Sequence, residues 1–556
     1  MKTIKRVVAV LMSLTMVVSG LVFTTKTNAA DSIDAWKSNA VITPSSGALV
    51  GAGYIDVEFD ASLSGYTYEV LLDNQPVYWR GNSIVNLDIS GETTSGATTK
   101  TFSSGTTVKT EVYTNKVQAH TITIKASKSG EQTITSDPLS FYVSKKGLAM
   151  GEDMGSKIQM KKFNCSWYYN WGTKAFGNSI DEEVAHMPMM WGAGQESIDG
   201  LSYLADSTSN YIMGFNEPDI GHQANMNSIL GLRAWKKYIS PLSMRKVSPA
   251  PADPNGASGW VNDFLNGVWG TYNDEGDIVY LSDYPNSPYD KFEETGVTDC
   301  DAVALHYYKG KTDINELVTA IERTWNAFHK PIWVTEVSVM GKKNTSYDFS
   351  YEIPERREQV KQFVTDIANR LDNIDYVERY CWFPYDVTKE NELDHMDGSG
   401  ATALFSYDTG GYTELGVTYS KVGNPSGYQK YSISENEMYK PEETTTAPET
   451  TTKQPTTTKA PAQISKPSAS TLNKPKNVKK KSVKLSWSKA NGATGYQLQY
   501  ALNKAFTKKV VTKNISKTSF KATKLKKKKK YFFRVRGVNQ AGFGAWSNIK
   551  SIKIKK

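Results

Sequence analysis

The chain of 556 residues is too long for a single hydrophobic core, because domains usually hold ~100–200 residues, so we expect about three domains. Its net charge of +9 is unevenly distributed. Residues 474–556 hold 25 of the 66 basic residues and no Asp or Glu, whereas the rest of the chain has 41 basic and 57 acidic residues. The three cysteines and six histidines form no CxxC pair or His/Cys cluster, so we expect no zinc site and no other metal or cofactor.

Residues 1–29 have the pattern of an export signal. Three basic residues among the first six precede an apolar run over 7–23, and small residues at 27–29 offer a cleavage site. A membrane anchor is the alternative, but the run is interrupted by hydroxyl residues and is short for a ~20-residue span. We therefore expect a secreted protein, either extracellular or associated with the cell surface.

Residues 30–143 are expected to form an all-β accessory domain. Alternating or clustered β-branched and aromatic residues, separated by turn residues, occur in IDVEFDASL (55–63), TYEVLLDN (67–74), HTITIKASK (120–128) and LSFYVSKK (139–146). This spacing predicts a β-sandwich of immunoglobulin-like type. Its aromatic residues could contact carbohydrate, or they could form the core of a spacer domain; the candidates are Tyr54, Tyr66, Tyr78 and Trp79.

Residues 144–436 alternate short apolar strands with amphipathic segments. The expected strands are GLAM (147–150), NCSWYYNW (164–171), AHMPMMWG (185–192), YIMGFNEP (211–218), KVSPAPA (246–252), DAVALHYY (301–308), PIWVTEVS (331–338) and YCWFPYD (380–386). Residues 314–328 and 356–374 repeat apolar residues at i, i+3, i+4 and i+7, as helices packed on a sheet do. Eight strands alternating with helices predict a central (β/α)8 TIM barrel.

Two further segments complete the expected organisation. Residues 437–471 are rich in Thr and Pro without apolar periodicity, which predicts an extended linker. Residues 472–556 contain a second set of strand-like segments that resemble a fibronectin type III domain, a β-sandwich. Trp487 stands where that family keeps a core Trp, and Tyr531 fits the Tyr of its sixth strand.

Two strand-like segments end in a carboxylate: GFNEPD (214–219) ends in Glu217, and WVTE (333–336) ends in Glu336. The active site of such a barrel lies at the C-terminal ends of its strands, where both glutamates fall. Either Glu alone could be an ordinary surface residue. Two glutamates at one barrel mouth are the pair that glycosidic hydrolysis requires, one to protonate the leaving oxygen and one to oppose the oxocarbenium-like transition state.

Aromatic residues cluster at the same strand ends. Their rings can pack on sugar C–H surfaces while their polar tips orient hydroxyl groups. The set comprises Trp167, Tyr169, Trp171, Trp191, Tyr308, Trp382 and Tyr385, with His306 between two of them. Asn216 can donate to a sugar 2-hydroxyl, and His306 or Tyr308 can orient Glu336.

The motifs SWYYNWG, MPMMWG, GFNEPD, HYY and PIWVTE together resemble glycoside hydrolase family 128, over about residues 145–432. This resemblance implies β-1,3-glucanase activity, with Glu217 as the acid/base and Glu336 as the nucleophile. It implies sugar-binding or supporting roles for Asn216, Trp167, Tyr169, Trp191, His306, Tyr308 and Trp382. The chain departs from the simplest family pattern at residues 253–299, a long segment expected to border the cleft and to affect the mode of cleavage.

The resulting expectation is a retaining endo-β-1,3-glucanase that acts on β-1,3-glucan as a monomer. The first alternative is another β-glycanase of the same barrel clan, because substrate choice depends on loop shape. The second, from a different class, is a non-catalytic polysaccharide-binding protein of the cell surface. The basic C-terminal module is expected to bind an anionic polymer of the cell wall or surface, and not nucleic acid.

Overall fold

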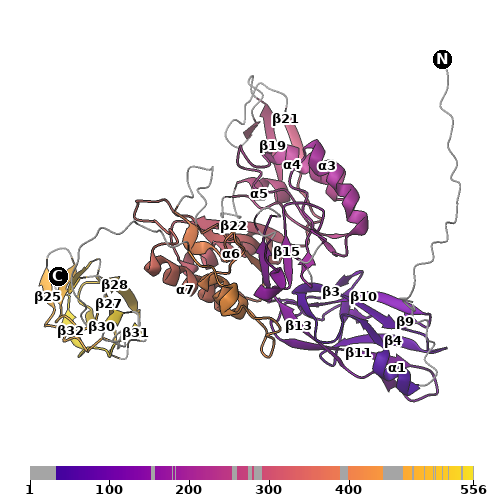
Figure 1. The fold of residues 1–556 in the computed structure, drawn as a ribbon, viewed down its shortest axis with the longest axis horizontal. Coiled ribbons are helices and arrows are strands. Elements are labelled where there is room, and N and C mark those ends of the chain that lie inside the picture. Colours follow the sequence, from indigo (N-terminus) through magenta and orange to yellow (C-terminus); the bar gives the residue numbers. More distant parts are fainter. Residues whose placement is uncertain are drawn as a thin grey trace, which may run out of the picture. The chain divides into compact units, whose positions relative to one another are not determined.

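The computed structural model describes residues 33–89, 91–151, 154, 157–177, 180–181, 183–252, 259–272, 278–280, 291–387, 398–441, 467–478, 481–493, 495–504, 506, 509–515, 517–523, 525–539 and 542–554 (Figure 1). The expected export signal and most of the expected linker lie outside these residues. The chain divides into two compact units, residues 1–443 and 444–556. Among the described helices, none combines the length and the apolar character needed to cross a membrane.

The N-terminal part of the first unit has two sheets around a shared core and a small third sheet, with the order β7 (Ser83–Ile84), β6 (Tyr78–Arg80), β8 (Thr98–Thr99). One sheet has the order β1 (Val41–Thr43), β3 (Gly53–Asp60), β10 (Thr107–Thr114), and the other β2 (Leu49–Gly51), β13 (Leu139–Ser144), β11 (Ala119–Ser127), β4 (Thr67–Leu72), β5 (Gln75–Pro76). Burial alternates along β3, so that Ile55, Val57 and Phe59 enter the core. Helix α1 (Ile33–Asn39) adds the fully buried Trp36.

Eight parallel strands follow: β14 (Lys146–Ala149), β15 (Trp167–Tyr169), β16 (Ala185–His186), β17 (Tyr211–Met213), β18 (Arg245–Val247), β22 (Val303–Lys309), β23 (Ile332–Val339) and β24 (Val377–Trp382). Six of them form one sheet and β17–β18 form a separate pair. Parallel bridges between Met189 and Met213 and between Val247 and Ala302 connect the two sheets, and β24 pairs with β14. Each of the eight strands lies within or overlaps a segment expected from the sequence.

The ring of strands separates two kinds of core. Its interior holds mainly aromatic, Met and Ala side chains, including Trp167, Tyr211 and Trp333. The outer faces of the strands pack on helices α4 (Ser228–Ala234), α6 (Ile314–Phe328), α7 (Pro354–Leu371) and α8 (Glu414–Lys421). Helix α6 has the expected bounds, and α7 begins two residues before and ends three before the expected helix over 356–374.

The alternation of strands and helices is less regular than the sequence pattern predicts. Between β15 and β16, the described residues 170–177, 180–181 and 183–184 contain no helix, because this Gly- and Asn-containing stretch has no apolar face to place on the sheet. Helix α3 (Gln195–Gly200) is short and continues into the 3₁₀ helix η2 (Leu201–Asp206). The long segment after β18 contains α5 (Trp260–Asn266), β19 (Gly267–Tyr272), β20 (Ile278–Tyr280) and β21 (Lys291–Thr295).

The C-terminal unit also has two sheets. The first has the order β25 (Lys476–Val478), β26 (Ser482–Ser486), β29 (Ser519–Ala522). The second has the order β28 (Val511–Ile515), β27 (Gly495–Ala501), β30 (Lys530–Asn539), β31 (Gly542–Phe543), and β32 (Lys550–Lys553) also pairs with β30. Trp487 and Tyr531 lie in its core, where the sequence places them. The unit begins before the expected residue 472, since the amide of Ser468 donates to Asn491. The start of the expected linker belongs to the barrel domain, since Tyr439 N donates to Tyr412 O over 2.8 Å.

Candidate active site

Glu217 and Glu336 lie together, although each needs a local departure from regular strand geometry to do so. Glu217 follows β17 in the left-handed region, with φ of 40°. A non-glycine residue held there is strained, and such strain concentrates at functional sites. The amide of Glu217 donates to Ala250 O over 2.8 Å, which fixes the turn against the end of β18.

Glu336 reaches the interior of the ring because of a bulge in β23. Trp333 belongs to the interior core and Val334 to the outer core. Strict alternation would place Glu336 on the same outer face as Val334. The pairing with β22 shifts register after Val334, which pairs with Leu305, so that Glu336 pairs with His306. The extra residue, Thr335, therefore turns Glu336 inward.

The carboxylate of Glu336 accepts three hydrogen bonds. The Tyr169 hydroxyl donates to Oε1 over 2.5 Å, and the Trp171 indole N–H donates to the same oxygen over 3.0 Å. The Tyr308 hydroxyl donates to Oε2. Burial, followed by the charge of Glu336, raises the pKa of both tyrosines well above its usual value, so both remain donors. Donors of this kind hold a carboxylate in place and stabilise its negative charge.

His306 connects the two glutamates and is fully buried. Its Nδ1 lies 2.9 Å from Glu217 Oε1, and its Nε2 lies 3.5 Å from Glu336 Oε1 without forming a hydrogen bond. Burial alone would lower the pKa of His306, but the charges of Glu336 and Glu217 outweigh it, so that the pKa is raised above 6.5. One acceptor atom from each of the three residues lies within 4.8 Å of the others.

The same three residues are the type that could hold a metal ion. Both oxygens of Glu336 already accept hydrogen bonds from Tyr169, Trp171 and Tyr308. A metal ion would have to displace these donors, whereas a proton shared between His306 and Glu217 requires no rearrangement. The arrangement therefore fits acid–base chemistry better than metal binding.

Aromatic rings surround Glu336 in a continuous series. Ring centroids lie 5.3 Å apart for Tyr169 and Trp171, 5.7 Å for Trp171 and Phe383, 5.0 Å for Phe383 and Tyr385, and 6.4 Å for Tyr385 and Tyr308. The charges of Glu336 and Glu217 add to burial in raising the pKa of Tyr385, so this predicted residue also faces the site.

An open cavity of about 360 Å³ adjoins this ring of aromatic residues. Trp171 and the predicted Trp191 line it, together with Tyr203, a residue that is 47% exposed. Lys174 lies with its Nζ 5.2 Å from the centroid of the Tyr203 ring, and Glu196 also contributes to the lining. Aromatic faces next to a few charged groups are suited to a sugar ring.

Asn216 is nearly buried beside Glu217. Its side-chain amide donates to Gln223 over 3.1 Å, while its Oδ1 has no hydrogen-bond partner in the structure. A buried polar atom without a partner is costly unless it serves a ligand or a water molecule. The position agrees with the expected role of Asn216 in binding a sugar hydroxyl.

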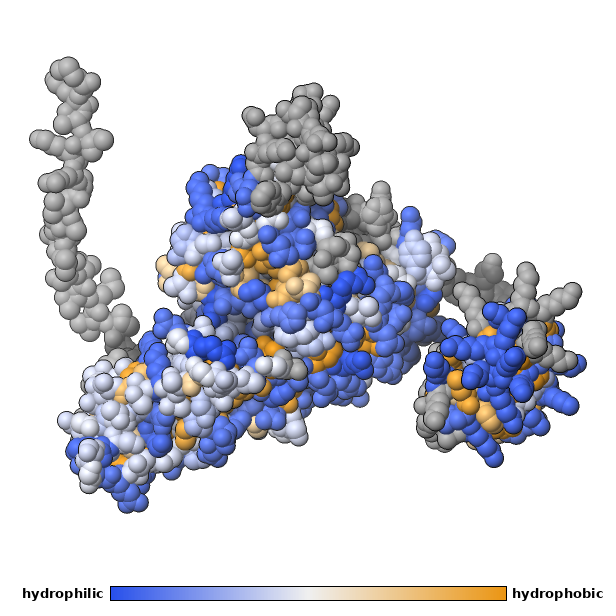
Figure 2. Space-filling model, turned by 180° about the vertical axis from the view of Figure 1, so that it is seen from behind, coloured by the Kyte–Doolittle hydropathy of each residue, from blue (hydrophilic) through white to orange (hydrophobic). Residues whose placement is uncertain are grey.

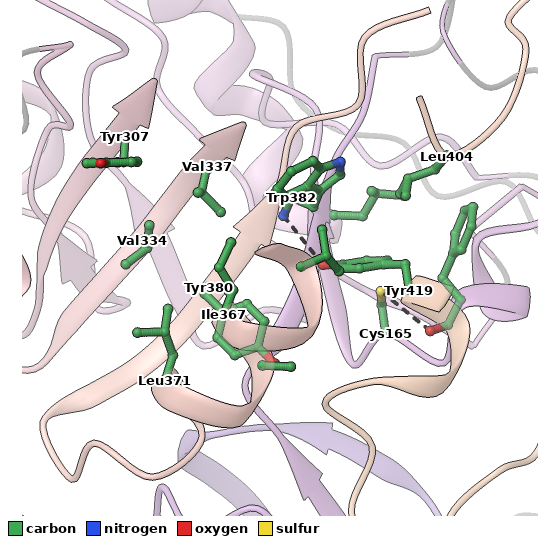
Figure 3. Packing of buried hydrophobic residues seen from close by; sticks show 14 of the residues in the cluster. Cys165, Tyr307, Val334, Val337, Ile367, Leu371, Tyr380, Trp382, Leu404 and Tyr419 are labelled. Atoms are coloured by element: carbon green, nitrogen blue, oxygen red, sulfur yellow. Dashed lines mark hydrogen bonds between the residues drawn. The ribbon is translucent and has the colours of Figure 1, made fainter. Parts of the chain in front are cut away.

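Two predicted sugar-binding residues do not face the cleft. Trp167 is fully buried deep in the ring, where its indole donates to Lys145 O and its ring lies 5.4 Å from that of Trp333. Trp382 points outward from β24, donates to Thr402 O and packs beside Leu404 and Tyr419 (Figure 3). Alternation explains Trp382, since its neighbour Cys381 occupies the interior. Trp167 points into the ring but lies at the start of β15, too far from the mouth to face the cleft.

Phe383 is a contact that the predicted set of aromatic residues lacks, whereas Trp171 belongs to that set but receives no role from the family resemblance. Trp171 has the same strand parity as Tyr169 and lies two residues nearer the mouth, so alternation already placed it on the correct face. Phe383 follows directly after β24, where an irregular backbone ends the alternation, so no periodic signal identifies it.

Comparison with known proteins identifies the families of two domains. The model of the family described as "Glycosyl hydrolase catalytic core" matches residues 147–419, and that of the fibronectin type III domain matches residues 465–553. Both domains expected from the sequence resemblance are thereby confirmed. Alkali-sensitive linkage protein 1 of Schizosaccharomyces pombe is 26% identical over 285 residues, which cover 50% of this chain and 44% of that protein. The chain thus spans less than half the length of this relative.

Among solved structures, similarity extends to proteins of glycoside hydrolase family 128. A subgroup I endo-β-1,3-glucanase from Amycolatopsis mediterranei, in complex with laminaritriose, is 24% identical with a TM-score of 0.35, covering 50% of this chain and 98% of that one. A subgroup VII oligosaccharide-binding protein from Trichoderma gamsii is 20% identical with a TM-score of 0.35, covering 50% and 92%.

Proposed function

Since residues 147–419 belong to the glycosyl hydrolase catalytic core family, we propose that the protein is a secreted, retaining endo-β-1,3-glucanase. The observation that carries this proposal is the close pair of buried glutamates joined through His306. Their nearest acceptor atoms lie within 4.8 Å. Retaining glycosidases hold their two carboxyl groups ~5–5.5 Å apart, whereas inverting enzymes need ~6.5–9.5 Å to admit a water molecule.

Glu217 suits the role of acid and base. It shares a hydrogen bond with His306, and its side chain remains 11% exposed at the mouth of the ring. In the first step Glu217 gives its proton to the glycosidic oxygen, and the leaving sugar departs. In the second step it takes a proton from water, which attacks the anomeric carbon.

Glu336 suits the role of nucleophile. Its three hydrogen-bond donors fix its orientation and stabilise the charge that attacks the anomeric carbon. Attack forms a glycosyl ester with one oxygen of Glu336 while the bond to the leaving oxygen breaks. Hydrolysis of this ester in the second step returns the carboxylate to the same three donors.

The proposed substrate rests on the sequence resemblance together with the shape of the cleft. The motifs of family 128 supply β-1,3-glucan as the substrate class, and the open cavity beside Trp171 and Trp191 can accept a polymer that continues past the site. Secretion is proposed from the sequence pattern of residues 1–29. Another β-glycanase activity would fit the same two glutamates, since loop shape decides the substrate.

Single-residue variants with added azide test the roles of the two glutamates. We expect Glu336→Ala to lose nearly all activity because no glycosyl ester can form. We expect Glu217→Ala to lose ~10²–10⁴-fold, and less in the first step on substrates with good leaving groups. Azide should give a β-glycosyl azide with the Glu217 variant and an α-glycosyl azide with the Glu336 variant. The opposite pairing would reverse the roles, and undiminished activity in either variant would remove that glutamate from the mechanism. A natural chain that hydrolyses no substrate would instead be a binding protein.

A polysaccharide panel tests the substrate class separately. We expect laminarin to be cleaved faster than xylan, mannan or cellulose, with oligosaccharides of several lengths as early products of endo cleavage. Faster cleavage of xylan or mannan would refute the β-1,3-glucan assignment. Release of a single short product from the outset would refute endo action.

A further inference from the structure

The three-stranded sheet of the C-terminal unit carries a row of lysines on its outer face. Strand register places Lys476 of β25 directly opposite Lys484 of β26, and Lys484 directly opposite Lys521 of β29. All three side chains are exposed. Neighbouring strands are ~4.8 Å apart, so the three charges stand side by side across the full width of this sheet.

This row is unfavourable for the module alone. Like charges directly opposite one another on a sheet destabilise it. Relief by a neighbouring carboxylate within the module is impossible, because residues 474–556 contain no Asp or Glu. The lysines are not needed for the core, which Val483, Leu485 and Ala522 build from the other face of the same strands. A repulsive row that packing does not require indicates a ligand of opposite charge.

Among the described strand residues, the remainder of the face is mainly polar and has no outward aromatic ring. Ser486 is paired with Ser519 beside the lysine row, and both are exposed. Of the described strand residues that point outward here, Val478 is the apolar one. Sheets that bind single-stranded nucleic acid stack bases on outward aromatic side chains, which these positions lack. The face of this unit that Figure 2 shows has blue, hydrophilic residues with orange, hydrophobic residues between them.

We propose that this face binds a linear anionic polysaccharide, with Lys476, Lys484 and Lys521 as its central contacts. The ammonium group of Lys acts as a point charge on a flexible stem, so it suits repeated carboxylate, sulfate or phosphate groups without requiring one geometry. Serine hydroxyls alongside can bond sugar hydroxyls. A polysaccharide is favoured over other polyanions because residues 147–419 of the same chain match the glycosyl hydrolase catalytic core, a choice that rests on the proposed function.

The test compares two triple variants of the full chain with equal net charge. Lys476→Gln/Lys484→Gln/Lys521→Gln removes the row, and Lys504→Gln/Lys509→Gln/Lys513→Gln removes three exposed lysines outside this sheet. Binding to immobilised polygalacturonate is measured from low to high salt, with neutral dextran as a control polymer. We expect the row variant to bind at least about tenfold more weakly. The slope of log binding constant against log salt concentration should become shallower by about two to three.

We expect the control variant to stay within about twofold of the natural chain, because charges beyond a Debye length of ~10 Å are screened. Equal weakening in both variants would show a general charge effect and overturn the site.

The row variant should unfold at the same temperature as the natural chain or higher, because a repulsion is removed. A lower unfolding temperature would contradict the premise that the lysine row is repulsive. Tighter, row-dependent binding of single-stranded DNA than of polygalacturonate would overturn the choice of ligand. Laminarin hydrolysis should be unchanged in both variants, so the outcome is independent of the proposed activity.

Discussion

Two histidines of the barrel domain meet opposite electrostatic surroundings. Burial lowers the pKa of His186 to about 4, and the charge of Asp181 only partly opposes this. At His306 burial acts in the same direction, but Glu336 and Glu217 reverse it and raise the pKa above 6.5. The difference arises from two carboxylates within reach of one ring and a neutral amide, Asn170, beside the other.

The charged form of His306 should therefore persist to higher pH than that of His186. A group with a raised folded-state pKa adds stability below its ordinary pKa and loses that contribution as pH rises through the folded-state value. We expect NMR titration to give a midpoint above 6.5 for His306 and near 4 for His186, with assignment by His306→Gln and His186→Gln. A midpoint of His306 below 6.5 would show that burial outweighs the influence of the two glutamates.

Trp171 and Trp382 allow one substitution to be compared in two places. Trp171→Phe removes an indole donor to Glu336, and a hydrogen bond to a charged group is worth ~1.5–3 kcal/mol. We expect kcat/KM to fall about 10- to 100-fold with little change in stability. Trp382→Phe removes a donor to Thr402 O within the outer core, so we expect a loss of about 1–2 kcal/mol of unfolding free energy and unchanged kinetics. Laminarin kinetics and urea unfolding measure both. A higher KM for Trp382→Phe would restore it to the cleft.

Strand β24 shows which part of this site the sequence could predict. Alternation within each strand correctly grouped His306 with Tyr308, and Tyr169 with Trp171. It could not show which of the two parities on β24 faces inward, because Trp382 and Cys381 are both apolar and either could fill the interior. Pairing with the neighbouring strands decides which alternate residues of β24 point inward, and the sequence of one segment does not encode that pairing.

The bulge at Thr335 could not be predicted from the sequence either. A run such as WVTEVS gives no local sign of an extra residue, since Val, Thr and Ser are all acceptable in a regular strand. The sequence nevertheless placed Glu336 correctly, because its position at the C-terminal end of the strand was inferred from the carboxylate and not from parity. Chemistry thus located the residue, and the bulge explains how it points inward.

A second irregularity in β24 places a carboxylate and a guanidinium side by side deep in the ring. Register with β23 shifts between Val377 and Arg379, so Glu378 is the extra residue. Hydroxyl groups of Tyr113 and Tyr211 donate to Glu378 over 3.0 and 2.9 Å. Arg379 donates to Ala52 O over 2.9 Å and lies 4.3 Å from the centroid of the Trp333 ring. Since Tyr113 and Ala52 come from the N-terminal domain, these contacts join it to the barrel.

Removing one charge of this element should cost more than removing both. Arg379→Met leaves the carboxylate of Glu378 buried without its nearest cation, and we expect a loss of about 3–5 kcal/mol of unfolding free energy. Adding Glu378→Gln removes that charge and should restore part of the loss. Urea unfolding of both variants measures this difference. A double variant less stable than Arg379→Met would show that the hydrogen bonds to the Glu378 carboxylate contribute more to stability than the compensation of its charge by Arg379.

At the scale of the whole chain, charge and core are both divided between the two units. The module of residues 474–556 carries uncompensated positive charge, whereas the preceding residues are acidic on balance. Each unit has its own hydrophobic core, formed in the C-terminal unit by residues such as Trp487, Leu498 and Phe533. Such a division allows one unit to change its surface without affecting the packing of the other.

Ending the chain after residue 443 should therefore leave the chemistry unchanged. Glu217, Glu336 and every described donor to them lie before this point, and the units have separate cores. We expect the shortened chain to hydrolyse short laminari-oligosaccharides within about twofold of the full chain's kcat/KM. Calorimetry of the full chain should show two unfolding transitions, of which the shortened chain keeps one at the same temperature. A shift of that transition, or a large loss of kcat/KM on short substrates, would show that the C-terminal unit supports the barrel directly. Either result would contradict the division of the molecule into an independent catalytic part and an independent binding part.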